Sequence, residues 1–102
     1  MAKAPKRLSP IHPGEILLEE FMKPLGLSAN KLGLELRVPS NRILAIAGGK
    51  RAVSADTALR LARYFNTTAD FWMNLQSRYD LQQAEHELAE AIAREVHPRS
   101  AA

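Results

Sequence analysis

Apolar residues recur along most of the chain at intervals of three and four, which is the spacing that lines one face of an α-helix. No stretch alternates apolar and polar residues with the two-residue period of a half-buried strand. The pattern therefore predicts an all-α protein, with helices over about residues 12–23, 28–36, 39–47, 54–65, 67–75 and 80–96.

The predicted helix boundaries coincide with residues that have special backbone preferences. Residues that favour a first helical position or an N-cap precede four of the helices, and they are Pro13, Ser28, Ser54 and Thr67 or Thr68. Residues that end helices follow four of them, and they are Pro24 with Gly26, Gly48-Gly49, Asn66 and His97-Pro98. We expect five helices to form a compact lambda-repressor-like domain to which the last helix is added.

Residues 29–48 fit the twenty-residue pattern of a helix-turn-helix. Gly33 occupies the fifth position, where the side chain points at the second helix and must be small. The ninth position is often glycine because the chain there is left-handed, but here it is Arg37, at a cost on the order of 1 kcal/mol. The positions that form the core between the two helices are all apolar, and they are Leu32, Leu36, Val38, Ile43 and Ile46. The alternative is a pair of consecutive core helices with no role in DNA binding.

A helix-turn-helix places the amino end of its second helix in the DNA major groove. Asn41 can pair with adenine, Arg42 on the flank with guanine or a phosphate, and Leu44 can touch a thymine methyl group. The complete set of candidate base-reading residues is Pro39, Ser40, Asn41, Arg42, Leu44 and Ala45. The candidates for phosphate contacts around this helix are Asn30, Lys31, Arg37, Lys50 and Arg51, each of which could instead be a solvated surface side chain.

The charge distribution favours a polyanionic partner for the front half of the chain. Residues 1–51 contain nine Lys/Arg and four Asp/Glu, a net charge of +5, whereas residues 52–102 contain five and seven, a net charge of −2. The 102 residues have room for one domain, and the chain has no cysteine for a disulfide or a thiolate metal site. With no signal peptide and no apolar run long enough to cross a membrane, we expect a cytoplasmic, nucleoid-associated protein.

The rear half of the chain offers candidates for a protein interface. Phe71, Trp72 and Leu75, with Tyr79, could form an aromatic recognition platform, but their helical spacing favours core packing, with part of the group at a dimer interface. The last helix has a short heptad-like seam at Leu81, Ala84, Leu88 and Ala91, which favours a symmetric dimer over packing back onto its own domain or fraying. The candidate dimer or partner interface comprises Phe71, Leu75, Tyr79, Leu81, Ala84, Leu88 and Ile92.

The sequence gives little support to a catalytic or metal-binding function. His12, His86 and His97 are far apart, and Gly48-Gly49-Lys50 lacks the strand and the spacing of a phosphate-binding loop. No serine has an evident base and orienting acid. We therefore expect a non-enzyme with no cofactor, no metal site and no catalytic residue.

Several segments together resemble the HigA/VapI antitoxins, which are short members of the Xre/Cro group of helix-turn-helix proteins. The resemblance covers about residues 11–81, and its most specific parts are the opening His12-Pro13-Gly14-Glu15 and the segment Phe71-Trp72-Met73-Asn74-Leu75-Gln76. It implies a dimeric antitoxin that represses its own operon and neutralises a HigB toxin, a RelE-like ribonuclease that cuts messenger RNA. The alternative is a stand-alone helix-turn-helix regulator without a toxin.

These observations predict four parts in the chain. Residues 1–9 are expected to form a flexible basic arm and residues 10–79 the DNA-binding domain. Residues 80–97 are expected to form a C-terminal helix for dimerisation or partner contact, and residues 98–102 a disordered tail.

Overall fold

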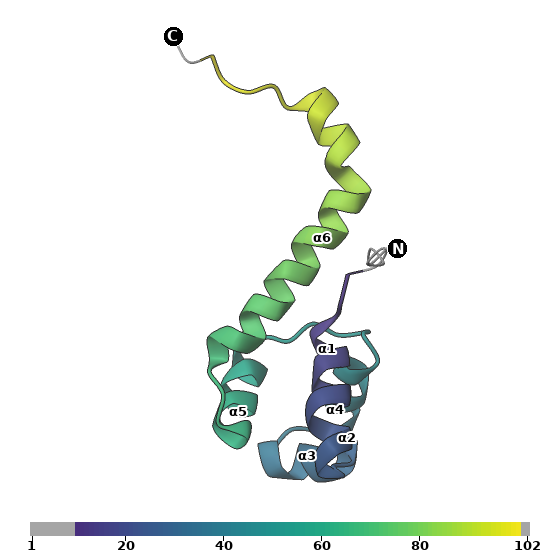
Figure 1. Cartoon of the computed structure of the whole chain (residues 1–102), viewed down its shortest axis with the longest axis vertical. Coiled ribbons are helices and arrows are strands. Elements are labelled where there is room, and N and C mark those ends of the chain that lie inside the picture. The colour runs from purple at the N-terminus through teal and green to yellow at the C-terminus, as the bar shows by residue number, and fades with distance from the viewer. Residues whose placement is uncertain (1–9, 101–102) are drawn as a thin grey trace, which may run out of the picture.

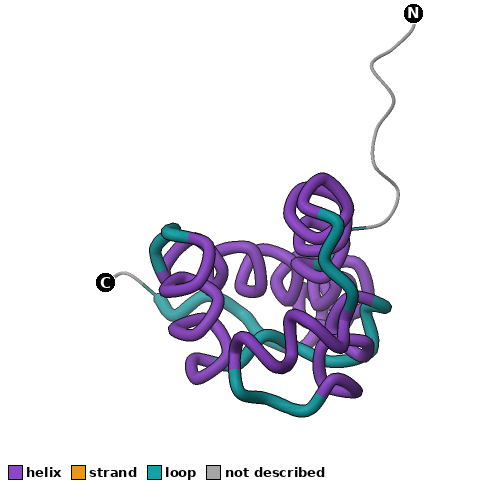
Figure 2. Tube along the Cα trace, turned by 90° about the horizontal axis from the view of Figure 1, so that it is seen from below, coloured by secondary structure: helices purple, strands orange, loops and turns teal. Residues whose placement is uncertain are grey.

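The computed structural model describes residues 10–100, and these form helices and connecting loops without any strand (Figures 1 and 2). The elements in chain order are α1 (Pro13–Ile16), the π-helix η1 (Leu17–Met22), α2 (Lys23–Leu25), α3 (Ala29–Leu36), α4 (Ser40–Ala47), α5 (Ala55–Phe65) and α6 (Ala69–Glu95). The all-α prediction is confirmed. The predicted basic arm, residues 1–9, lies outside the described residues, as do residues 101–102 of the predicted tail.

The first three elements follow one another as a single helical segment over residues 13–25. Pro13 occupies its first turn as predicted, but Pro24 does not end it, because α2 continues to Leu25 and Gly26 ends it with φ +65°. A proline ring clashes with the carbonyl four residues earlier in a regular α-helix. The π-helical turns that precede Pro24 are wider, which relieves this clash and lets the proline fit in the last turn.

The predicted caps are confirmed at three further helices. The hydroxyl groups of Ser28, Ser54 and Thr68 accept hydrogen bonds from the backbone N–H three residues later, at 3.0, 3.3 and 3.0 Å. Asn66 ends α5 in the left-handed region with φ 62°, also as predicted. These signals act within one turn of the chain, which is why the sequence alone located them.

The two helices predicted over residues 67–75 and 80–96 are in fact one helix, α6, which runs from Ala69 to Glu95. Residues 76–79 contain neither proline nor glycine, so the backbone has no local reason to break there. Gln76 is buried in this stretch, and its Nε2 donates a hydrogen bond to Asp80 Oδ1 at 2.9 Å, one turn later. The helix ends before His97-Pro98, as expected, and the described residues that follow are not helical.

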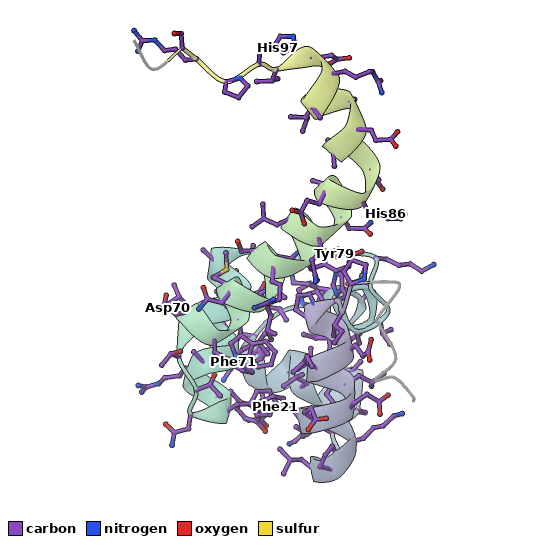
Figure 3. The ribbon with its side chains drawn as sticks, turned by 45° about the horizontal axis from the view of Figure 1, so that its top comes forward. Phe21, Asp70, Phe71, Tyr79, His86 and His97 are labelled. Carbon is purple, nitrogen blue, oxygen red and sulfur yellow. The ribbon has the colours of Figure 1, made fainter. Side chains whose placement is uncertain are left out.

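The core lies among η1, α3, α4, α5 and the start of α6. Its fully buried side chains include Leu17, Leu32, Ile43, Ile46, Leu61 and Trp72. Trp72 donates a hydrogen bond from Nε1 to Thr67 Oγ1 at 2.9 Å, which satisfies its one polar atom. The ring of Phe21 contacts those of Phe65 and Trp72, and also that of Phe71 (Phe21 and Phe71 are labelled in Figure 3). Core packing of the aromatic group is thus confirmed for Trp72, whereas Phe71 stays 38% exposed.

Helix α6 leaves the body of the protein beyond Tyr79 and extends into solvent (Figures 1 and 3). The radius of gyration is 17.2 Å, compared with about 13 Å for a compact chain of this length. Residues 10–79 therefore form the packed body, and the part of α6 from residue 80 onward is an extension of its last helix.

Candidate nucleic-acid interface

The position of α4 is set by its close crossing with α3. A Cβ atom added to Gly33 would lie 2.8 Å from the carbonyl oxygen of Val38 and 3.2 Å from Ser40 Cα. A larger side chain would therefore push the two helices apart, as the sequence predicts. The core beside this crossing contains the buried residues Leu32, Leu36, Ile43 and Ile46. Val38 is half-buried against the same core.

Arg37 adopts the left-handed conformation that the turn requires, with φ 62° and ψ 43°. The N–H of Val38 donates to the carbonyl of Gly33 at 2.9 Å, which closes the end of α3. The side chain of Arg37 is exposed. The turn therefore keeps its usual geometry without glycine and adds a cation beside the amino end of α4.

Helix α4 has one buried and one exposed face. Ile43 and Ile46 are fully buried, whereas Asn41 is exposed and Leu44 is 61% exposed. Pro39 is the N-cap residue and is exposed, while Ser40 and Ala45 are half-buried. Five of the six candidate base-reading residues thus lie on or next to the open face of this helix.

Arg42, the sixth candidate, lies differently. Its Nη1 is 3.3 Å from Asp56 Oδ2 in the first turn of α5, and its side chain is only 24% exposed. The predicted position on the flank of α4 agrees with this arrangement. The ion pair with Asp56 was not predicted, because the two residues are fourteen positions apart and no local pattern links them.

The candidate phosphate-contacting residues surround α4 and are all exposed: Asn30, Lys31, Arg37, Lys50 and Arg51. Lys31 Nζ lies 3.0 Å from Glu35 Oε2 on α3, and this hydrogen-bonded carboxylate raises the pKa of the lysine. Lys50 and Arg51 belong to the loop after α4, whose shape is fixed by Gly49 at φ 76° and by a bond from Lys50 N to the Ala45 carbonyl at 2.8 Å.

The loop after α4 also contacts Gln76 of α6, and the sequence did not predict this contact. Gln76 Oε1 accepts a hydrogen bond from Val53 N at 2.7 Å, and both residues are buried. A glutamine among the aromatic and aliphatic residues of 71–76 was the available signal, because a buried amide needs partners. Gln76 thus connects the α6 helix to the loop that carries Lys50 and Arg51.

The opening segment of the domain also supports α4, through contacts that only the structure shows. A Cβ on Gly14 would meet the carbonyl group of Ile46 inside van der Waals contact, so α1 and α4 touch backbone to backbone. His12 caps α1, because its Nδ1 accepts a hydrogen bond from Gly14 N at 2.9 Å. The His12 ring packs edge-on against Tyr79 at 4.7 Å, and burial lowers the pKa of this histidine although Asp80 opposes the shift.

The candidate dimer or partner residues separate into two groups. Leu75, Tyr79 and Ala84 are half-buried against the body or next to it. Leu81, Leu88 and Ile92 are 66%, 48% and 49% exposed on the extended part of α6, and Phe71 is 38% exposed. Only the second group therefore leaves substantial apolar surface open.

The described residues contain neither a metal-binding cluster nor a membrane-spanning helix. Within residues 10–100, no three His, Asp or Glu side chains come together in a way that could hold a metal ion. No helix in that range is both long and apolar enough to cross a membrane.

Comparison with known proteins identifies the family. A helix-turn-helix family model matches residues 18–72. The chain is 53% identical over 77 residues to virulence-associated protein I of Dichelobacter nodosus, a match that covers 76% of this chain and 71% of the relative. It is 42% identical over 79 residues to the HTH-type transcriptional regulator YbaQ of Escherichia coli strain K12, covering 78% of this chain and 70% of the relative.

A solved structure adds a match over nearly the whole fold. The antitoxin HigA of Pseudomonas aeruginosa, solved with the higBA promoter, is 44% identical, with a TM-score of 0.87 over 89% of this chain and 99% of that chain. The matched region contains α3, the turn at Arg37 and α4, which together form the unit that the sequence pattern located. The chain therefore belongs to the helix-turn-helix family and, within it, to the HigA/VapI-type antitoxins.

Proposed function

We propose that this protein binds operator DNA through α4 and represses its own operon. The observation that carries the proposal is the division of α4 into a buried face at Ile43 and Ile46 and an open face at Asn41 and Leu44. A helix clamped in this way presents its open face to a groove as a rigid body. The solved HigA relative carries promoter DNA, which supports the same partner here.

The exposed face of α4 supplies the chemistry for reading bases. Asn41 presents an amide that can pair with the N6 and N7 edge of adenine, and Leu44 can contact a thymine methyl group. Ser40 lies in the first turn, where its hydroxyl can reach a base or the backbone. Pro39 and Ala45 complete the face, because they can contact the DNA and their small side chains let the helix approach it.

The surrounding cations supply affinity without sequence information. Arg37, Lys50 and Arg51 are exposed on the two turns that flank α4, and Asn30 and Lys31 lie in the first turn of α3. Contacts from such residues to phosphate oxygens fix the register of the protein on the duplex. The charge of +3 over residues 10–79, from nine Lys/Arg and six Asp/Glu, has the sign that this role requires.

The extended part of α6 supports a symmetric homodimer. Leu81, Leu88 and Ile92 recur on one face at helical spacing and remain about half exposed or more. A helical segment of about fifteen residues is marginal without tertiary contacts, so this part of α6 gains stability when a second copy covers its apolar face. Two copies would set two α4 helices about 34 Å apart, one turn of DNA, on a palindromic operator.

We further propose that the protein neutralises a HigB-like toxin, an mRNA-cleaving enzyme of the RelE type. Membership in the HigA/VapI group supports this role. The net charge of −4 over residues 80–95, from five Asp/Glu and one Arg, favours a basic partner for the rear of the molecule. The alternative is a stand-alone regulator, which the description of the Escherichia coli relative as a transcriptional regulator favours.

Fluorescence anisotropy with two duplexes tests the DNA-binding proposal. One duplex carries the promoter of the protein's own operon, and the other carries the same bases in scrambled order. We expect the promoter to bind about a thousandfold more tightly at physiological salt, within the range of specific repressors. Equal affinity for both duplexes would overturn the proposal.

Co-expression with the neighbouring reading frame tests the toxin proposal. We expect the two proteins to co-purify and the antitoxin to restore growth. If neither occurs while promoter binding is intact, the protein is a stand-alone regulator.

A further inference from the structure

Arg42 differs from the other candidate base-reading residues because its guanidinium lies against a neighbouring helix. Nη1 is 3.3 Å from Asp56 Oδ2, and the side chain is 24% exposed, whereas Asn41 next to it is open to solvent. Asp56 follows the Ser54 cap in the first turn of α5. The amino ends of α4 and α5 are therefore joined by one ion pair at the edge of the proposed DNA-binding surface.

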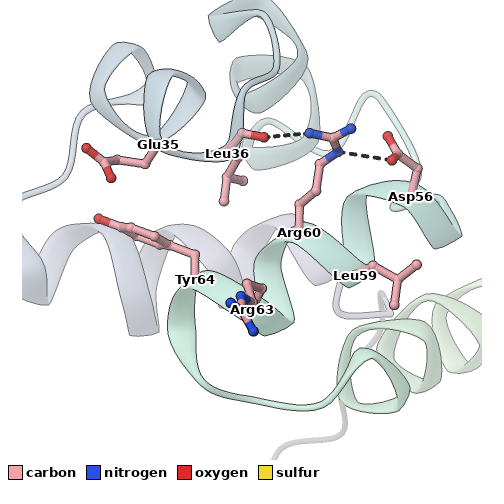
Figure 4. Close-up of a pocket in the computed structure, with 7 residues that line it drawn as sticks. All are labelled: Glu35, Leu36, Asp56, Leu59, Arg60, Arg63 and Tyr64. Atoms are coloured by element: carbon pink, nitrogen blue, oxygen red, sulfur yellow. Dashed lines mark hydrogen bonds and ion pairs between the residues drawn. The ribbon is translucent and has the colours of Figure 1, made fainter.

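The Asp56 carboxylate binds a second guanidinium at the same time. Arg60 Nε donates to Asp56 Oδ1 at 3.0 Å, and Arg60 Nη1 donates to the Leu36 carbonyl at 2.8 Å (Figure 4). The hydrogen bond from Arg60 is the main reason why the pKa of Asp56 is lowered, and the charge of Arg42 adds to it. The carboxylate is thus charged at neutral pH and links α4 to α5, while Arg60 joins α5 to the end of α3.

The contact between Arg42 and Asp56 depends on charge attraction more than on hydrogen-bond geometry. Its 3.3 Å length exceeds the roughly 2.7–2.9 Å of a strong charge-assisted bond. Arg42 Nε is buried and has no hydrogen-bond partner among the described residues. An unpaired buried donor is unfavourable, so the side chain would leave this position if the attracting charge were removed.

We propose that Asp56 is a positioning residue that determines what Arg42 does on DNA. By holding the guanidinium against α5, it withholds Arg42 from the base edges that Asn41 would read and limits affinity for DNA of arbitrary sequence. Discrimination between bases then falls to Asn41 and its neighbours on the open face, and Arg42 contributes no phosphate contact while it is held. This inference rests on the proposed function of α4.

The test compares the affinities of the wild-type protein and Asp56→Asn for two duplexes, the operon promoter and its scrambled version. Removal of the charge frees Arg42 for a phosphate, so we expect affinity for the scrambled duplex to rise roughly threefold to tenfold at low salt, with a salt slope steeper by about 0.9. We expect a smaller gain on the promoter, so that the ratio of promoter to scrambled affinity falls.

Asp70→Asn is the matched control. Asp70 lies in the first turn of α6 after the Thr68 cap, which is the place that Asp56 has in α5 (Figure 3). Its removal changes the net charge equally at the same helical position. We expect less than half of the gain seen with Asp56→Asn and no change in the promoter ratio.

A double-mutant cycle decides whether the effect passes through Arg42. In an Arg42→Gln background, Asp56→Asn should no longer raise the affinity for the scrambled duplex. The same gain in that background, or an equal gain with Asp70→Asn, would overturn the proposal. If Asp56→Asn does not fold, Asp56→Ser removes the charge, keeps a first-turn hydroxyl and takes its place in the cycle.

The measurements on the two duplexes distinguish a failure of this inference from a failure of the proposed function on which it rests. A wild-type protein that does not prefer the promoter contradicts the proposed operator binding. The scrambled-duplex measurements still decide whether Asp56 restrains Arg42, because they need no sequence preference.

Discussion

Helix α4 and residues 81–95 of α6 both leave large aliphatic side chains in solvent, but the rest of each helix differs. Leu44 of α4 is 61% exposed, while Ile43 and Ile46 on the opposite face are fully buried. Leu81 of α6 is 66% exposed, and none of residues 81–95 is buried. An exposed leucine on a packed helix belongs to a rigid surface, whereas the exposed leucines on the extended part of α6 form the apolar face that we propose a second copy covers.

Gly14→Ala should have the largest effect, because it removes the backbone contact that fixes α4 against α1. The added Cβ would meet the Ile46 carbonyl group, which is backbone and cannot rotate away. We expect a loss of about 3 kcal/mol or more in the free energy of unfolding, measured by urea denaturation.

Gly48→Ala serves as the control for this prediction. Its Cβ would lie 3.2 Å from the Leu44 carbonyl oxygen, and its φ of −84° suits alanine. We expect a change of no more than about 0.5 kcal/mol. Equal stability of the two variants would show that α4 does not depend on this crossing.

Leu88→Asp should weaken the dimer without unfolding the body of the protein, because residues 81–95 contribute no core residue. In a two-fold dimer both copies lose a buried leucine, so we expect about 3 kcal/mol of dimer stability to be lost, as measured by sedimentation equilibrium. Operator affinity should fall with it, while the packed body of the monomer, residues 10–79, stays folded.

Ala93→Asp is the matched control, because Ala93 is exposed and lies about 140° around the helix from Leu88. It adds the same charge to the same helix and should leave the dimer intact. A dimer that persists in Leu88→Asp would mean that another surface joins the two copies.

Asn41→Ala tests the reading role of the open face of α4. We expect a loss of about 1–3 kcal/mol in promoter binding, with little change on the scrambled duplex. Lys50→Ala should instead weaken both duplexes alike and reduce the salt slope by about one. The prediction fails if Asn41→Ala weakens both duplexes equally, because Asn41 would then contribute no discrimination.

His12 gives the smallest expected effect and a dependence on pH. Its Nδ1 accepts a hydrogen bond only when unprotonated, and the folded pKa lies below the usual 6.5. The folded state therefore binds fewer protons near that pH, so the contribution is complete above pH 6.5 and is lost as pH falls through the folded pKa. We expect about 1 kcal/mol, the usual value of an N-cap.

Urea denaturation at pH 7.5 and at pH 5.5 measures this loss. His12→Asn keeps a cap acceptor that does not titrate, so its stability should change less between the two values. Asp56 does not interfere, because its lowered pKa places its own loss below 3.8. A wild-type protein with equal stability at both values would remove His12 from any role in the cap.

The agreement between sequence and structure follows the range of the interactions. The caps at Ser28, Ser54 and Thr68 and the left-handed Asn66 depend on atoms within one turn, so residue type was enough to locate them. The helix-turn-helix was equally accessible, because its apolar spacing and Gly33 lie within twenty consecutive residues. The single helix α6 was missed, because the sequence analysis ended one helix at residue 75 and began another at 80, although no residue between them breaks a helix.

The sequence by itself therefore determined the all-α class, the capped helix ends and the twenty-residue unit that contains α4, but neither the continuity of α6 nor the passage of the first helical segment through Pro24. Only the tertiary structure decided that Gly14 touches Ile46, that Gln76 holds Val53, and that Arg42 faces Asp56. These pairs are 14 to 32 positions apart, and they meet because the helices pack at particular angles. Local propensity sets which residues form a helix, whereas the packing of several helices sets which side chains of that helix remain free to bind.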